Sequence, residues 1–279
     1  MNAQQKIKSE IDDGCSGNHE TAARKMADWM PNLIIIGAPK SATSTLAYTL
    51  SKHKNIFCCQ PSEPKFFGSK YYKGWDWYSK IFFEGRNCKI RIEASTKYSS
   101  SEELFKRTPE LIHHYIPNTK LVYLTRSPIK RTISHWRHYK GRFHNKKQVP
   151  DFHEILDNKS LYERIVQCSM YFKQLKRFRQ YFPDKHIHCI TFEDLTTKPI
   201  KTLDALFKFA NVKGNPEKLL RAEDGSLKLP HQNQAGAKER AFIEAPNLTS
   251  EFKARLQNEF RKDSRKFLKY IEKPAEYWE

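Results

Sequence analysis

The chain has 279 residues, of which 50 are Lys or Arg and 31 are Asp or Glu, so its formal net charge of +19 favours anionic ligands or partners. No apolar run approaches the roughly 20 residues of a membrane-spanning helix, which argues against an integral membrane protein. The six cysteines form no C-x-x-C pair, and no H-E-x-x-H or G-x-S-x-G motif occurs, so zinc sites, serine hydrolysis and a disulfide framework lack their sequence signatures.

The N-terminal segment 1–28 is polar and lacks the apolar centre of a signal peptide. We expect it to be a flexible tail on a cytoplasmic protein. The remainder, 29–279, contains no Gly/Ser-rich or Pro-rich linker, and α/β folds of this length often form one unit. A single domain over 29–279 is therefore expected.

The first predicted element is a strand that runs into a turn and a helix, in the segment LIIIGAPKSATSTL at 33–46. Lys40 and the hydroxyl residues after it follow the apolar strand directly. Backbone N–H groups, hydroxyls and one ammonium then meet at a helix N-terminus, which binds anions. The segment is not a Walker A loop, which needs glycine just before the lysine. A buried strand followed by a Ser/Thr-capped helix is the structural alternative.

This turn resembles the 5′-phosphosulfate-binding loop of sulfotransferases that use 3′-phosphoadenosine 5′-phosphosulfate (PAPS). Family members usually carry glycine where this chain has Ala42. The resemblance implies that Lys40 stabilises the leaving group, 3′-phosphoadenosine 5′-phosphate (PAP). It also implies donor binding by Pro39, Lys40, Ser41, Ala42, Thr43, Ser44 and Thr45.

Farther along the chain, QPSEPKFF at 60–67 places an acidic residue before a Phe-Phe pair, as similar sulfotransferases do. The resemblance makes Glu63 the candidate general base that removes the acceptor proton. Glu93, in IEASTKY at 92–98, matches a family segment near the acceptor and is the reserve base, with His53 next. A surface glutamate in a Pro-rich loop is the alternative for Glu63.

Between these carboxylates lies the aromatic segment YYKGWDWY at 71–78. Its rings are suited either to stacking on a flat or sugar-like acceptor or to a packing hairpin. After it, Ser99 to Glu102 resembles a capping box, so a helix is expected from there to Tyr115, before Pro117 ends it.

The second donor motif is KLVYLTRSPIKRTISHWRHY at 120–139, an apolar strand followed by a helix with Pro128 at its first position. Ser134 lies about two turns into that helix. By resemblance, Arg126 at the strand end and Ser134 bind the 3′-phosphate of the donor, a task suited to a planar guanidinium. A lone arginine after a strand is usually a solvated charge.

A strongly basic stretch surrounds this motif: 111–150 has no Asp or Glu but nine Lys or Arg and five His. It could serve the donor, an acidic acceptor, nucleic acid or a membrane surface. The part at 140–147, KGRFHNKK, is predicted to be a loop, with a solvated charged surface as its plain alternative.

The C-terminal half continues the alternation of helices and strands. The apolar spacing predicts one amphipathic helix from Leu161 to Phe182, a strand at 187–192, a helix from Pro199 and a last helix at 252–271. We therefore expect a single-domain, three-layer αβα fold with a mainly parallel central sheet and a phosphosulfate loop related to P-loop folds. In this family a late basic loop often covers the 3′-phosphate, which makes Lys238 and Arg240 candidates unless 231–240 is a plain surface loop.

The resemblance implies a sulfotransferase that moves the sulfuryl group of PAPS to a hydroxyl or amine of a small-molecule or carbohydrate-like acceptor, releasing PAP. Neither a metal nor a nucleic-acid partner is expected. Two alternatives remain: a small-molecule kinase with a similar loop, and a non-enzymatic binder of polyanions that relies on the basic stretch.

Overall fold

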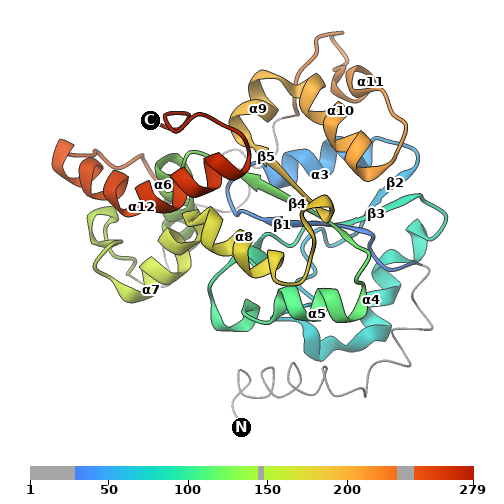
Figure 1. Ribbon diagram of the computed structural model, residues 1–279, viewed down its shortest axis with the longest axis horizontal. Helices are drawn as coiled ribbons and strands as arrows, with labels where there is room; N and C mark the ends of the chain where they lie inside the picture. Colours follow the sequence, from blue (N-terminus) through green and yellow to red (C-terminus); the bar gives the residue numbers. More distant parts are fainter. Residues whose placement is uncertain (1–28, 144–147, 231–241) are drawn as a thin grey trace.

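A computed structural model describes residues 29–143, 148–230 and 242–279. A five-stranded sheet forms its centre, and all of its paired strands run parallel (Figure 1). The order across the sheet is β2-β3-β1-β4-β5. The strands are β1 (Leu33–Gly37), β2 (Ile56–Cys58), β3 (Ile90–Glu93), β4 (Lys120–Thr125) and β5 (Ile187–Thr191). This confirms the predicted α/β fold with a parallel sheet.

Helices cover both faces of the sheet (Figure 1). Strands such as β1, whose five residues are all buried, need this cover because neither of their faces is polar. The helices are α3 (Thr43–Ser51), α4 (Gly74–Phe82), α5 (Thr108–Tyr115), α6 (Pro128–Phe143), α7 (Lys159–Leu161), α8 (Tyr171–Arg179), α9 (Phe192–Thr197), α10 (Pro199–Ala210), α11 (Pro216–Leu220) and α12 (Ser250–Tyr270).

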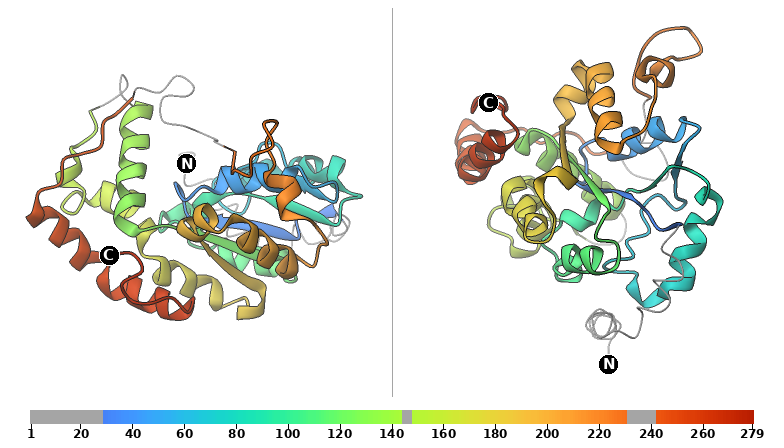
Figure 2. Two further views of the ribbon diagram at one scale, coloured as in Figure 1. Left: turned by 90° about the horizontal axis from the view of Figure 1, so that it is seen from above. Right: turned by 45° about the vertical axis from the view of Figure 1, so that its right-hand side comes forward.

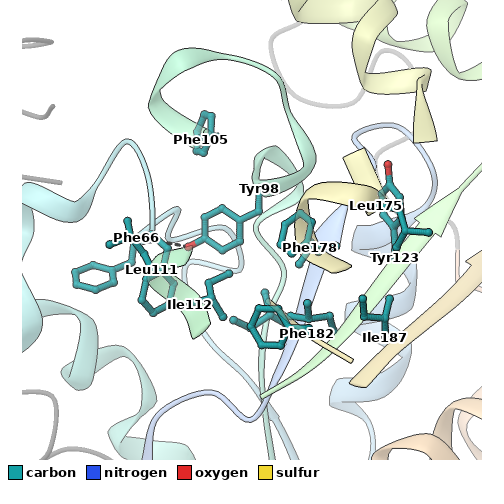
Figure 3. Close-up of a cluster of buried hydrophobic side chains, with 14 of the residues drawn as sticks. Phe66, Tyr98, Phe105, Leu111, Ile112, Tyr123, Leu175, Phe178, Phe182 and Ile187 are labelled. Carbon is teal, nitrogen blue, oxygen red and sulfur yellow. Dashed lines mark hydrogen bonds between the residues drawn. The ribbon is translucent and has the colours of Figure 1, made fainter. Parts of the chain in front are cut away.

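Side chains of β1 alternate between two hydrophobic cores. Ile34 and Ile36 pack in the core that α4, α5 and α8 cover, part of which Figure 3 shows. Leu33 and Ile35 pack in the opposite core, under α3, α10 and α11. A third apolar cluster joins α6, α7 and α12. The ribbons of α6 and α12 lie at the side of the sheet (Figure 2). The molecule is thus a three-layer αβα unit with α6 and α12 added beside it.

The strand order determines where ligands can bind. β1 lies between β3 and β4, and the chain passes from one half of the sheet to the other between β3 and β4. At such a switch point, parallel sheets bind ligands in the crevice outside the carboxyl ends of the strands. Gly37 of β1 is paired with Tyr123 of β4, so the segments that carry Lys40 and Arg126 leave the sheet next to each other.

The helix predicted from Ser99 to Tyr115 is wrong in its first half. Two 3-10 turns, Thr96–Ser99 and Glu103–Phe105, precede α5. The hydroxyl of Ser100 accepts a hydrogen bond from the Glu102 N–H at 3.2 Å. Such local side-chain bonds compete with helical hydrogen bonding, and regular helix begins only after them.

The continuous helix predicted from Leu161 to Phe182 is also wrong. A π-helical turn, Tyr162–Val166, and a 3-10 turn, Gln167–Ser169, separate α7 from α8. Arg131 of α6 supplies the physical reason, since its guanidinium donates to the Ile165 carbonyl and, at 2.5 Å, to the Ser169 hydroxyl. A tertiary contact therefore replaces the regular pattern that the apolar spacing predicts.

Two further segments differ from expectation. The aromatic segment at 71–78 forms a 3-10 turn and the start of α4 rather than a hairpin, and Tyr78 stacks on Phe66 with ring centroids 4.1 Å apart. Because both rings are fully buried, they serve packing and not acceptor stacking. Lys140 to Phe143, predicted as loop, is the last turn of α6.

Several predictions lie outside the described residues: the flexible tail at 1–28, the loop character of 144–147, and the donor contacts of Lys238 and Arg240. Across 29–143, 148–230 and 242–279, no helix combines the length and the apolar character that crossing a membrane requires.

Candidate active site

The turn after β1 contains two non-glycine residues in the left-handed backbone conformation. Lys40 and Ala42 both adopt left-handed conformations, with φ of 71° and 69°. Glycine occupies this region without the clash of a Cβ atom, which explains why the resembling loops prefer glycine at the position of Ala42. The departure noted in the sequence thus leaves the turn intact at a local cost of about 1 kcal/mol.

Exchanging Ala42 for glycine is expected to leave the free energy of unfolding unchanged or to raise it by up to about 1 kcal/mol. Relief of the left-handed strain opposes the larger chain entropy that glycine brings to the unfolded state. The control is Ala254→Gly, in the exposed middle of α12, which should cost about 1 kcal/mol. Urea unfolding compares the two; an equal loss at both positions would contradict the strain at Ala42.

A cavity of about 610 Å³ opens at the carboxyl ends of β1 and β4. Ser41 of the predicted donor loop is fully buried and is not among the residues that line this cavity, and its hydroxyl has no hydrogen-bond partner among the described residues. The structure brings together nearly all of the predicted site residues that it describes. The predicted residues lining the cavity are Pro39, Lys40, Ala42, Thr43, Ser44, Thr45, Glu63, Arg126 and Ser134.

Arg126 joins the two donor motifs. Its guanidinium donates to the Lys40 carbonyl at 3.4 Å and lies 4.4 Å from the ring of Phe192. The Tyr171 hydroxyl donates to the Arg126 carbonyl at 2.6 Å and so fixes the backbone. Burial lowers the pKa of Arg126, and its buried Nε has no partner within the described chain. An anion in the cavity would supply both a partner and a compensating charge.

The Glu63 carboxylate is held by two neighbouring side chains, one of which follows β3. The Thr96 hydroxyl donates to Glu63 Oε1 at 2.9 Å, and the Lys65 ammonium lies 3.3 Å from Oε2. About a third of the Glu63 side chain, 34 %, is exposed. The carboxylate is therefore held in place by two partners while remaining open to the cavity.

The reserve bases do not line this cavity. Glu93 is fully buried at the end of β3, where it accepts a hydrogen bond from the Tyr78 hydroxyl at 2.5 Å. Burial is the main reason why the pKa of Glu93 is raised. His53 is bonded through Nε2 to the Lys213 carbonyl at 2.9 Å, near α10. Neither residue is among those that line the space around the donor loop.

The raised pKa of Glu93 predicts a pH dependence of stability. A carboxyl whose pKa is higher in the folded than in the unfolded state stabilises the fold at low pH, and this contribution is lost as pH rises through the folded pKa. Glu93→Gln, which resembles the neutral acid, should therefore gain stability relative to the wild type as pH rises. The gain should approach about 1.4 kcal/mol per pH unit between the unfolded and folded pKa values of Glu93. Urea unfolding from acid to neutral pH measures this, and Glu84→Gln, at an exposed position, should show no such trend.

The site also contains residues that are not among the predicted site residues. The additional cavity-lining residues are Lys65, Thr96, Lys97, His135, His138, Arg142, Phe192, Thr196, Leu229 and Pro230. His138 Nδ1 is 3.4 Å from the Lys40 ammonium. The sequence signal for His135 and His138 was the pattern S-H-x-x-H that begins at Ser134. Residues three and four apart lie on the same face of a helix, so His138 shares a face with both Ser134 and His135. Among the described lining residues Glu63 is the one carboxylate, so the cavity is strongly electropositive.

Comparison with known proteins identifies relatives of this chain. The chain is 28% identical over 207 residues to heparan sulfate glucosamine 3-O-sulfotransferase 5 of Mus musculus, an alignment that covers 71% of this chain and 58% of that protein. It is 26% identical over 211 residues to the bifunctional heparan sulfate N-deacetylase/N-sulfotransferase of Drosophila melanogaster, covering 67% of this chain and 20% of the relative. The chain thus matches a little over half of the first relative and a fifth of the second.

Solved structures share the fold. A sulfotransferase from Alicyclobacillus acidocaldarius superposes with a TM-score of 0.66 at 19% identity, covering 89% of this chain and 98% of that one. A mouse sulfotransferase complexed with PAP gives a TM-score of 0.55 at 16% identity, with 84% and 85% covered. The family model described as "Sulfotransferase domain" matches residues 30–269, which include both strand-end motifs and Glu63. The chain therefore belongs to the sulfotransferase domain family.

Proposed function

We propose that this protein transfers the sulfuryl group of PAPS to a hydroxyl or amine of a small-molecule or carbohydrate-like acceptor. One observation carries the proposal: the loop after β1 and Arg126 after β4 line the same cavity, together with Ser134. Two anion-binding groups at neighbouring strand ends suit a donor that has a phosphosulfate at one end and a 3′-phosphate at the other.

The chemistry of the cavity residues fits such a donor. Backbone N–H groups and hydroxyls at the start of α3, together with the Lys40 ammonium, would hold the 5′-phosphosulfate. Arg126 and Ser134 would hold the 3′-phosphate. The unpartnered buried atoms, Ser41 Oγ and Arg126 Nε, are the kind of polar groups that a polyanionic ligand would satisfy. PAPS supplies the activated sulfuryl group.

Two side chains carry the proposed chemistry. The Glu63 carboxylate takes the proton of the acceptor as the new O–S or N–S bond forms and the bond from sulfur to the phosphate oxygen breaks. The Lys40 ammonium stabilises the negative charge that grows on that departing oxygen. Thr96 and Lys65 keep the Glu63 carboxylate in position. The rest of the rate enhancement comes from holding the reacting groups in line.

The acceptor is proposed from the relatives and from charge. Two of the similar proteins are named for action on heparan sulfate, a carbohydrate. Three further cations line the cavity of this chain: Lys65, Lys97 and Arg142. Their positive charges suit a polar acceptor better than an apolar one. The absence of a metal requirement and the cytoplasmic location remain predictions.

Calorimetric binding of PAP against ATP tests the donor assignment. We expect PAP to bind and ATP to bind at least about tenfold more weakly, because Arg126 and Ser134 would lose the 3′-phosphate. Transfer of labelled sulfate from PAPS to a panel of hydroxyl and amine acceptors, including oligosaccharides, then tests the reaction. Preference for ATP with magnesium-dependent turnover would favour the kinase alternative. PAP binding that survives loss of Lys40 and falls steeply with salt, without turnover, would favour the polyanion binder.

A further inference from the structure

Arg131, the fourth residue of α6, is a buried cation that has no part in the proposed mechanism. Its side chain is fully buried, and no carboxylate of the described residues forms an ion pair with it. It donates instead to the Pro39 carbonyl at 3.2 Å, the Ser169 hydroxyl at 2.5 Å, His135 Nδ1 at 3.0 Å and the Ile165 carbonyl. Two of these partners, Pro39 and His135, line the cavity.

Burying a charge without a counter-ion is costly, so the position of Arg131 needs a compensating interaction. The Pro39 carbonyl belongs to the donor loop itself, and the cavity lined by that loop is proposed to hold a polyanion. A negatively charged donor would act as the missing counter-charge from the other side of the loop. The Arg131 guanidinium is thus placed to hold the donor loop through Pro39 and to favour binding of an anionic donor in the cavity.

The hydrogen bond from Arg131 determines which ring nitrogen of His135 carries the proton. A guanidinium can only donate hydrogen bonds, so Nδ1 of His135 must be the acceptor and the ring proton must be on Nε2. Burial lowers the pKa of His135 well below its ordinary value, and the positive charges of Arg131 and His138 on α6, Lys97 after β3 and Lys40 in the donor loop act in the same direction. The ring is neutral and can only donate through Nε2.

This N–H belongs to a residue that lines the cavity. His135 is 6% exposed and lines the space around the donor loop, and within the described chain Nε2 has no hydrogen-bond partner. We propose that Arg131 locks His135 as a neutral hydrogen-bond donor, whose Nε2–H binds a phosphate or sulfate oxygen at the phosphosulfate end of PAPS. The inference rests on the proposed function. His135 then has no capacity to accept the acceptor proton, which leaves that role to Glu63.

Three replacements of His135 separate the donor role from packing. Gln can present its amide N–H near the place of Nε2, whereas Asn reaches only as far as Nδ1 and Phe keeps the ring without either nitrogen. We expect His135→Gln to bind PAP and PAPS within about threefold of the wild type. Asn and Phe should weaken PAPS binding by about 10- to 100-fold, the effect of losing a hydrogen bond to a charged group. A loss for both ligands indicates the 5′-phosphate as the acceptor, and a loss for PAPS alone indicates the sulfuryl group.

Nitrogen NMR of the histidine side chains in the ligand-free protein tests the lock without reference to catalysis. The wild type should show a neutral His135 with its proton on Nε2 from pH 6 to 8, and Arg131→Met should lose that fixed tautomer. A cationic ring or a proton on Nδ1 in the wild type would overturn the inference. So would PAPS binding that is unchanged in His135→Phe. If Arg131→Met does not fold, as thermal unfolding would show, the wild-type spectrum and the three His135 variants still decide. A wild type that binds neither PAP nor PAPS would overturn the proposed function as well.

Discussion

Replacing Lys40 with alanine is expected to lower the turnover of sulfuryl transfer by about 10²- to 10³-fold, the usual effect of deleting a preorganised charge stabiliser. The side chain lines the cavity from a left-handed position in the donor loop, and its ammonium lies 3.4 Å from His138 Nδ1. Negative charge grows on the departing oxygen only as the bond to sulfur breaks. In the proposed mechanism the ammonium stabilises the transition state more than the bound substrates, so turnover should fall more than affinity.

Steady-state kinetics with labelled PAPS would measure this effect, and calorimetry with PAP would report ground-state binding separately. Lys80→Ala is the matched control, because it removes one lysine charge from an exposed position on α4. It should leave turnover within about twofold of the wild type, since exposed charges at a distance are screened by salt. Equal losses in both variants, or a Lys40→Ala enzyme with normal turnover, would remove Lys40 from the mechanism.

The exchange of Glu63 for glutamine should reduce turnover by about 10²- to 10⁴-fold and leave the affinity for PAP unchanged. Glutamine keeps the size of the side chain and an oxygen that can accept from the Thr96 hydroxyl, now 2.9 Å from Glu63 Oε1. It cannot take up the acceptor proton. The loss should therefore appear in the chemical step and not in folding or donor binding.

Glu84→Gln, at an exposed position between α4 and β3, is the control for charge removal and should behave as the wild type. If Glu63→Gln kept normal turnover, the base would have to be sought elsewhere in the site. Glu93 and His53 would be poor replacements because neither lines the cavity. His138, which does line it, would become the next residue to test.

Much of this site could be predicted because it is built from local sequence. An apolar strand followed by a polar turn and a helix N-terminus is encoded by neighbouring residues, as at 33–46 and 120–139, and the structure has strands and helices there. The identity of Arg126 as a strand-end residue follows in the same way. The helix that begins at Pro199 and the last helix, α12, also follow the spacing of their apolar residues.

Segments shaped by contacts with distant residues could not be predicted in this way. The interruption between α7 and α8 depends on Arg131, which is 34 residues away from Ile165 in sequence. The burial of Glu93 under Tyr78, and the inward packing of the aromatic segment that contains Tyr78, depend on how α4 meets the sheet. Apolar spacing records which face of an element is buried, but not which element covers it.

The order of residues along the chain was enough to predict the turns at the two strand ends, the parallel α/β class and the chemical types of the groups in those turns, because strands, turns and helices depend mainly on neighbouring residues. The packing of distant segments was needed to learn that Glu63, and not Glu93, lines the cavity, and that His135 lines it while bonded to Arg131. Burial and the pairing of hydrogen-bond donors with acceptors depend on the packing of segments far apart in sequence, and that packing is complete only when the sheet order places β1 beside β4.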